Sequence, residues 1–324
     1  MPDNAPDAGM ARWIHPAAIL VATDLSDLDR LMPFAFEQAS EAGARLILLH
    51  VLASTAAISA DAAGMPYYDP AGALEFAAKT LEPWCALARR QNIACDALVR
   101  EGQPARQIEA SIRQFQADRV LLGTRSRSRL GKMLVGSVAE QVLRSVNLPV
   151  MTVGPEAHLP VETEAPHGHE DRVVLHATTL RETSRPSAAL ACQLAASFKA
   201  TLVLLNVLPP VDRMRRSGQL ADVDSVAMRE LRRLAEETGA GCCLEIEPVV
   251  IHGTPYIEIL SEASARNASL IVLGATRRSA FENLTRDRTV YQVLAHARCP
   301  VLTIREPQTI GTEAITEGVT AFHS

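Results

Sequence analysis

Short apolar runs alternate along the chain with segments whose apolar residues recur every three or four positions. The short runs are typical of buried strands, and the longer spacing is typical of amphipathic helices. In the first half, the runs predict strands at 18–23, 46–52, 95–100, 119–123 and 149–153. In the second half, the clearest predicted helices cover 189–198 and 226–237. Strands that alternate with helices predict a parallel sheet with helices on both faces.

The two halves of the chain resemble each other. The segment AILVATDLS (18–26) resembles VVLHATTLR (173–181), and RLILLHVL (45–52) resembles TLVLLNVL (201–208). Three further pairs share one offset of 151 residues: 100–108 with 251–259, 118–124 with 269–275, and 147–153 with 298–304. Five matches in the same order predict a tandem duplication.

The duplication predicts two α/β domains and a connection between them. We expect the first domain at 14–154, a linker at 155–170 and the second domain at 171–306. The connecting segment has few apolar residues and many Pro and Glu residues, which favours an exposed linker. The tail at 307–324 has no periodicity and is expected to be frayed.

Composition narrows the class of protein. A length of 324 residues with 48% apolar residues fits two globular domains, and the net charge of −5 argues against duplex nucleic acid as the main partner. No stretch of about 20 apolar residues predicts a membrane span. The six cysteines form no CxxC motif, which favours reduced thiols and a cytoplasmic location.

Residues suited to a phosphorylated ligand follow the predicted first and fourth strands. Parallel sheets bind ligands beyond the carboxyl ends of their strands. The first strand ends at 22–24 and the fourth at Gly123, and a helix starts after Gly136 with a Ser137-x-x-Glu140 capping-box pattern. The free amides and dipole of that helix favour an anion. Basic residues lie between the two glycines: Arg125, Arg127, Arg129 and Lys132.

These residues resemble the nucleotide motif of the universal stress protein family, Gly-x2-Gly-x9-Gly-(Ser/Thr). Gly123, Ser126, Gly136 and Ser137 have that spacing, with Ser126 in place of the second glycine. The resemblance covers nearly the whole chain outside the linker and the termini. It implies two tandem open-twisted parallel five-stranded α/β domains, of the adenine-nucleotide α-hydrolase-like kind, packed as a pseudo-dimer.

The same resemblance implies a stress-response protein that binds ATP with Mg²⁺ in its first domain and acts through a protein partner. Its adenine and ribose would lie against Ala22, Thr23, Asp24, Val51 and Leu122. Its phosphates would face Ser126, Gly136, Ser137 and Val138, with Gly123 allowing close backbone approach. If the position of Ser126 needs a positive φ, serine costs about 1 kcal/mol relative to glycine there.

The second domain departs from this pattern. Thr179 stands in place of Asp24, and Asn206 stands in place of His50. Its glycine positions hold Arg277 and Asp287, so a carboxylate would occupy the helix N-terminus in place of a phosphate. We therefore expect a degenerate, structural copy.

Alternative interpretations stay open. The chain can be a nucleotide-free interaction module in which the glycines only form turns and Asp24 or Ser26 caps a helix. It can also hydrolyse ATP slowly, although no catalytic constellation is recognisable. A metal site at His167 and His169 and a redox pair at Cys242 and Cys243 are weaker hypotheses.

The fifth strands suggest how the two domains pair. Family members commonly dimerise through these edge strands, which here lie at 149–153 and 300–304. Both are short and apolar, and an open edge of this kind favours association. Because the linker raises the effective concentration of one domain near the other, we expect intramolecular pairing, with a homo-oligomer as a further possibility.

Overall fold

The computed structural model describes residues 5–53, 69–124, 135–158, 172–211, 223–240, 244–276 and 288–306. Several predictions therefore fall outside the described residues. They concern the linker and tail beyond 158 and 306, and the residues Ser126, Arg125, Arg127, Arg129, Lys132, His167, His169, Cys242, Cys243, Arg277 and Asp287.

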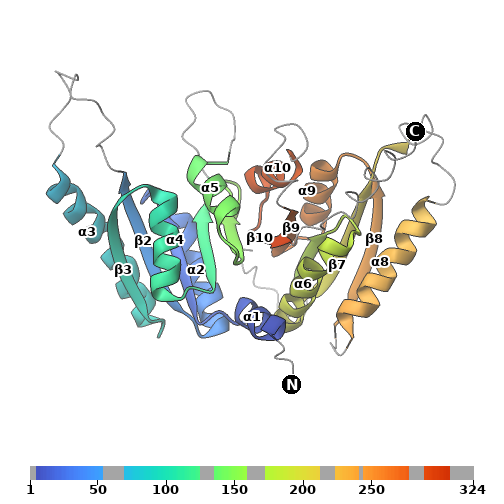
Figure 1. The fold of residues 1–324 in the computed structure, drawn as a ribbon, viewed down its shortest axis with the longest axis horizontal. Coiled ribbons are helices and arrows are strands. Elements are labelled where there is room, and N and C mark those ends of the chain that lie inside the picture. The colour runs from blue at the N-terminus through green and yellow to red at the C-terminus, as the bar shows by residue number, and fades with distance from the viewer. Residues whose placement is uncertain are drawn as a thin grey trace, which may run out of the picture.

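Each repeat alternates strands and helices, as the apolar runs predict (Figure 1). The first repeat contains β1 (Ala18–Thr23), α2 (Leu28–Ala42), β2 (Arg45–Ala53), α3 (Pro70–Arg90), β3 (Cys95–Gly102), α4 (Pro104–Phe115), β4 (Arg119–Gly123), α5 (Ser137–Ser145) and β5 (Val150–Val153). The second contains β6 (Val173–Ala177), η3 (Glu182–Ser184), α6 (Arg185–Phe198), β7 (Thr201–Leu208), α8 (Val223–Gly239), β8 (Ile246–His252), α9 (Pro255–Ala265), β9 (Leu270–Thr276), α10 (Arg288–His296) and β10 (Val301–Glu306).

The strands form one ten-stranded sheet in the order β3-β2-β1-β4-β5-β10-β9-β6-β7-β8. All pairs within a repeat are parallel, and β5 and β10 pair antiparallel at the centre. The register places Met151 opposite Leu302. The predicted pairing of the fifth strands, and with it the pseudo-dimer, is confirmed.

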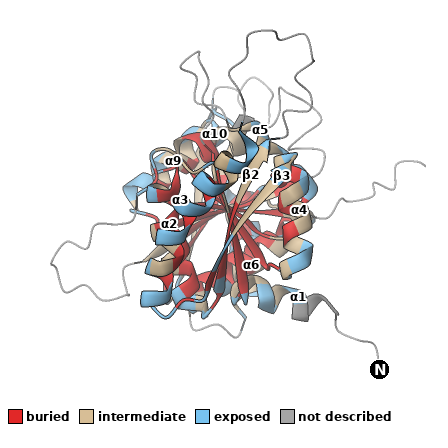
Figure 2. Cartoon of the chain, turned by 90° about the vertical axis from the view of Figure 1, so that its left-hand side faces the viewer, coloured by how far each residue is buried: buried red, intermediate tan, exposed pale blue. Residues whose placement is uncertain are grey.

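Helices cover both faces of the sheet, because successive strand residues point to opposite sides. Ile19 and Val21 face one side with α2, α3, α6 and α8, whereas Ala18 and Leu20 face the other with α4, α5, α9 and α10. The strands are buried between helices whose outer faces are exposed (Figure 2). Among the described residues, no helix is both long and apolar enough to cross a membrane.

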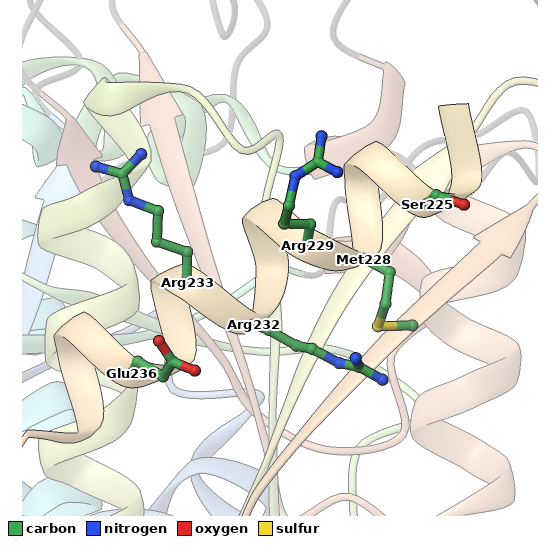
Figure 3. A pocket seen from close by; sticks show the side chains of 6 residues that line it. All are labelled: Ser225, Met228, Arg229, Arg232, Arg233 and Glu236. Carbon is green, nitrogen blue, oxygen red and sulfur yellow. The ribbon is translucent and has the colours of Figure 1, made fainter. Parts of the chain in front are cut away.

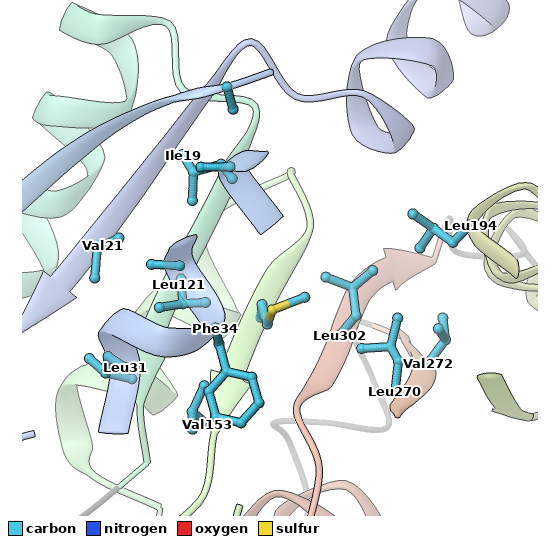
Figure 4. Packing of buried hydrophobic residues seen from close by; sticks show 14 of the residues in the cluster. Ile19, Val21, Leu31, Phe34, Leu121, Val153, Leu194, Leu270, Val272 and Leu302 are labelled. Carbon is cyan, nitrogen blue, oxygen red and sulfur yellow. The ribbon is translucent and has the colours of Figure 1, made fainter. Parts of the chain in front are cut away.

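The apolar core continues across the junction between the repeats. Leu121 and Val153 of the first repeat belong to the same cluster as Leu270, Val272 and Leu302 of the second (Figure 4). Leu302 is fully buried. The two repeats therefore share one continuous apolar core at the junction, rather than meeting through the surfaces of two separately folded domains.

Polar and packing contacts outside the strands also reinforce the junction. Arg172 of the second repeat pairs with Glu37 and Glu41 of α2. Just beyond β5, Ala157 is buried and the His158 N–H donates to the Arg298 carbonyl oxygen (3.1 Å). The first residues of the predicted linker are thus packed against the second repeat.

An N-terminal helix, α1 (Ala5–Ile14), precedes the first strand and is not predicted by the apolar pattern. The Arg119 guanidinium at the start of β4 donates to the Trp13 carbonyl oxygen (2.6 Å) and to Gln38 of α2. Arg12 pairs with Asp118 (2.8 Å). Because α1 also packs against α6, it lies across the base of the junction (Figure 1).

Candidate nucleotide site

The predicted site residues of the first repeat that the structure describes gather at one end of the sheet, where β1, β2 and β4 finish. Ala22 lies directly opposite Leu122, and Thr23 lies opposite His50, next to Val51. The N–H of Gly136 donates to the Thr124 carbonyl oxygen (3.2 Å), which holds the start of α5 at the end of β4. Parallel topology thus brings together segments that are more than 100 residues apart in the sequence.

Four apolar site residues share one face of the sheet. Ala22, Val51, Leu122 and Val138 all contact the cluster beneath α4 and α5. Leu122 is buried, whereas the other three are only partly buried. They form an apolar wall that remains partly open at the sheet end.

The turn between β1 and α2 exposes one carboxylate and buries another. The Leu25 N–H donates to Thr23 Oγ1 (2.9 Å), and Leu25 adopts a left-handed φ of 73°. Asp24 is exposed and accepts hydrogen bonds from the Ser26 N–H (2.9 Å) and hydroxyl (2.7 Å). The expectation that Asp24 or Ser26 caps α2 is wrong, because the tight turn places Asp27 at the N-cap position.

The N-terminus of α5 also differs from the prediction in one respect. The capping box based on Ser137 is wrong, because Gly136 occupies the N-cap position and has no side chain to cap the helix. Glu140 pairs with Arg144 instead. Gly136 is extended, with a φ of −61°, so its lack of a side chain matters more than its conformation. Because Gly136 provides no side-chain cap, the first amides of α5 are left available to a ligand.

Two charged residues beside Gly123, Asp27 and Arg30, were not predicted from the sequence to belong to the site. The Thr23 hydroxyl donates to Asp27 Oδ1 (2.6 Å), and a Cβ on Gly123 would lie 2.3 Å from Asp27 Oδ2. Burial raises the pKa of Asp27, and the nearby Asp24 carboxylate adds to this effect. Arg30 Nε and Nη2 are buried without a hydrogen-bond partner in the described residues. The close packing of Asp27 therefore explains why position 123 is a glycine. In the sequence, the four-residue spacing of Thr23 and Asp27 was the signal that could have predicted their contact.

The second repeat keeps the framework of this site. The Leu180 N–H donates to Thr178 Oγ1 (3.1 Å), and Leu180 has a φ of 58°, as in the first repeat. The Asn206 amide donates to the Thr178 carbonyl oxygen (2.8 Å), and His50 Nδ1 makes the same contact with the Thr23 carbonyl oxygen (2.9 Å). The exchange of His for Asn thus preserves the hydrogen bond between neighbouring strands.

The second repeat lacks the exposed carboxylate. Thr179 occupies the position of Asp24, and its hydroxyl lies 3.1 Å from the Ser184 hydroxyl. The apolar wall is kept, since Ala177, Val207 and Leu273 contact the cluster beneath α9 and α10. The two sites therefore differ in their polar groups more than in shape.

The described residues also outline a surface hollow of about 540 Å³ along α8 (Figure 3). Its described lining comes from this one helix: Ser225, Met228, Arg229, Arg232, Arg233 and Glu236. Within the part of the chain that the structure describes, no group of three or more His, Cys, Asp or Glu residues could hold a metal ion. The hollow brings no groups from different elements together, so we do not assign it a ligand.

Comparisons with known proteins identify the class. The model of the universal stress protein family matches residues 17–154 and 172–305. A universal stress protein of Methanocaldococcus jannaschii is 30% identical over 28% of this chain and 52% of its own length. One of Mycobacterium tuberculosis is 34% identical over 42% of this chain and 46% of its own length. The matches to these two curated relatives span about half of their length.

A solved structure supports the same fold across both repeats. The crystal structure of a universal stress protein from Archaeoglobus fulgidus covers 89% of this chain and 98% of its own, with a TM-score of 0.66 and 19% identity. Because the family model matches most of the sequence in two copies, the chain belongs to the universal stress protein family, as a tandem member.

Proposed function

We propose that this protein is a stress-response regulator that binds ATP, with Mg²⁺, in its first repeat. The observation that carries the proposal is the combination of three features at one sheet end. These are a partly open apolar wall, the exposed Asp24 carboxylate, and a helix N-terminus whose N-cap residue, Gly136, has no side chain to cap it. An adenine nucleotide has an apolar base, ribose hydroxyls and phosphates, and these three features match its three parts.

The residues at this site fit an adenine nucleotide. Ala22, Thr23, Asp24, Val51 and Leu122 would line the base and the ribose, since they lie on adjacent ends of β1, β2 and β4. The amides after Gly136 would meet the phosphates together with Ser126, Ser137 and Val138. Bound Mg²⁺ would neutralise phosphate charge, and carboxylate oxygens such as those of Asp24 are ligands that it prefers.

The same features favour binding over turnover. Asp24 already accepts two hydrogen bonds from Ser26, and these hold its carboxylate in place. Such a group can orient a nucleotide or a metal-bound water, and the latter would give only slow hydrolysis. Bound nucleotide would instead change the surface that a protein partner contacts at the end of β4. The cytoplasm, which supplies ATP, is the compartment that this function requires.

The second repeat, by the same reasoning, is a structural partner. Thr179 offers no charge, and Asp287 would add a carboxylate at the start of α10 where phosphate would otherwise lie. A like charge at this position opposes phosphate binding. We therefore expect one nucleotide per chain.

Calorimetric titration of ATP and Mg²⁺ into the full chain tests the proposal. Asp24→Ala is expected to weaken binding by at least about tenfold, because it removes a charged hydrogen-bond acceptor. The matched variant Thr179→Ala, in the second repeat, is expected to leave affinity and stoichiometry unchanged. No binding to the wild-type chain would favour a nucleotide-free interaction module and overturn the proposal. Equal losses in both variants would contradict the assignment to the first repeat.

A further inference from the structure

Two cysteines of the first repeat meet far from the nucleotide site, at the outer edge of the sheet. Cys85 lies in the last turns of α3, and Cys95 is the first residue of the edge strand β3. Their sulfur atoms are 2.6 Å apart, and both side chains are buried, with 0% and 4% exposure. A disulfide needs a separation of about 2.05 Å, so only a small movement is required.

We propose that Cys85 and Cys95 form a reversible disulfide that fastens α3 to the edge strand β3 when the cell is exposed to peroxide. The pair lies on consecutive elements joined by a short turn at 91–94. This proposal is independent of the proposed nucleotide function.

The surroundings of the pair favour a thiolate. The hydrogen bond from the Cys95 thiol lowers the pKa of Cys85, and the Arg89 charge acts in the same direction. Burial and the carboxylates of Glu82 and Asp96 oppose these effects. Arg89 is half exposed and donates to the Cys95 carbonyl oxygen (2.9 Å), so its positive charge lies beside the pair. Thiolates, rather than thiols, attack peroxide.

The chemistry balances with hydrogen peroxide as the oxidant. The Cys85 thiolate attacks one peroxide oxygen, so an S–O bond forms, the O–O bond breaks, and the departing hydroxide takes up a proton to give water. The Cys95 sulfur then attacks the Cys85 sulfenic acid. The S–S bond forms, the S–O bond breaks, and the second hydroxide leaves as water with the Cys95 proton. Two thiols are oxidised and one peroxide is reduced; a dithiol reverses the reaction by exchange.

Such a bond suits a protein whose compartment normally keeps thiols reduced, where disulfides are transient and sense oxidants. It would close a short loop between α3 and β3 and raise the stability of that edge. Cys299 provides a contrast, because burial raises the pKa of its thiol to about 12 and keeps it protonated.

Peptide mapping of the full chain tests the proposal. Trypsin places Cys85 on peptide 80–89, Cys95 on 91–100, Cys192 on 182–199, Cys299 on 299–305, and Cys242 with Cys243 on 234–266. The native protein is treated with equimolar peroxide, its remaining thiols are alkylated at mildly acidic pH, and it is then digested without reductant. We expect peptides 80–89 and 91–100 joined by a disulfide, and their release by dithiothreitol.

Two further measurements keep the test decisive. Oxidation is expected to raise the melting temperature of the wild-type chain by about 5 °C and to leave that of Cys95→Ser unchanged. Cys299 is expected to remain alkylated as a free thiol. The proposal is overturned if both peptides stay fully alkylated while other cysteines oxidise, if the bond forms only after unfolding, or if oxidation lowers the melting temperature.

Discussion

The two repeats share a backbone framework and differ in the charged groups placed on it. Both carry the left-handed Leu turn after their first strand, and both tie that strand to its neighbour through a side chain of the second strand. Directly after its first strand the first repeat exposes a carboxylate, at Asp24, whereas the second has Thr179 at this position. The comparison indicates that the framework serves folding and that the polar residues decide whether a site can bind a ligand.

The comparison extends into the core. Arg119 in β4 is buried and tied to α1 and α2, whereas the equivalent residue in β9 is Leu270. In the first strands, Val21 corresponds to the buried His176, whose Nδ1 lies 3.0 Å from the Val272 carbonyl oxygen. Each repeat therefore carries one buried basic residue that the other replaces with an apolar one.

The largest expected effect comes from a charge at the junction that both repeats need. Leu302→Lys would place an ammonium group opposite Met151 in a fully buried position, at a cost of about 4 kcal/mol in the free energy of unfolding. We expect the melting temperature to fall by about 10 °C in calorimetry. Gln141→Lys, on the exposed face of α5, is the control. A change below about 1 kcal/mol for Leu302→Lys would contradict the pairing of the repeats as a main source of stability.

The next effect concerns acid stability. Burial lowers the pKa of His176 from 6.5 to about 4, so the unfolded chain takes up a proton at higher pH than the folded chain. Stability should therefore fall as the pH drops from 6.5 to 4, by about 3 kcal/mol from this residue. His176→Val, which copies Val21, is expected to remove this part of the pH dependence in urea unfolding curves. His158→Ala, an exposed histidine, should retain it; equal slopes for His176→Val and wild type would refute the prediction.

A third prediction introduces one residue of the second repeat at the matching position of the first. Gly136→Asp imitates Asp287 and should weaken ATP binding by about a hundredfold, because it places a carboxylate where phosphate would bind. Aspartate is a favourable N-cap residue, so the helix itself should be preserved. Gly136→Asn adds nearly the same volume without charge and is expected to lose less affinity. Unchanged affinity in Gly136→Asp would remove the start of α5 from the site.

The smallest expected effect tests the shared framework. His50→Asn should change the free energy of unfolding by less than about 0.5 kcal/mol, because Asn206 already makes the same hydrogen bond in the second repeat. His50→Ala, which removes the bond, should cost about 1 kcal/mol. Chemical denaturation distinguishes the two variants. Equal losses in the free energy of unfolding for His50→Asn and His50→Ala would mean that asparagine does not replace this hydrogen bond in the first repeat.

The strands and their pairing were predictable because buried parallel strands leave continuous apolar runs, such as Ala18–Thr23. The pairing of the strands at 149–153 and 300–304 followed from the repeat and the family resemblance, whereas the register that places Met151 opposite Leu302 came only from the structure. Helix α1 was not predictable, since its position depends on Arg119 and Asp118, which lie more than 100 residues away. Asp27 was not predicted because the left-handed turn at Leu25 decides which of the neighbouring polar residues is buried at the N-cap position of α2.

Native mass spectrometry at saturating ATP and Mg²⁺ tests most directly whether the two repeats differ as binding sites. The account predicts one nucleotide bound per chain in the wild type, one in Thr179→Ala, and a much lower occupancy in Gly136→Asp. Two nucleotides per chain, or none in the wild type, would contradict the assignment of nucleotide binding to the first repeat alone.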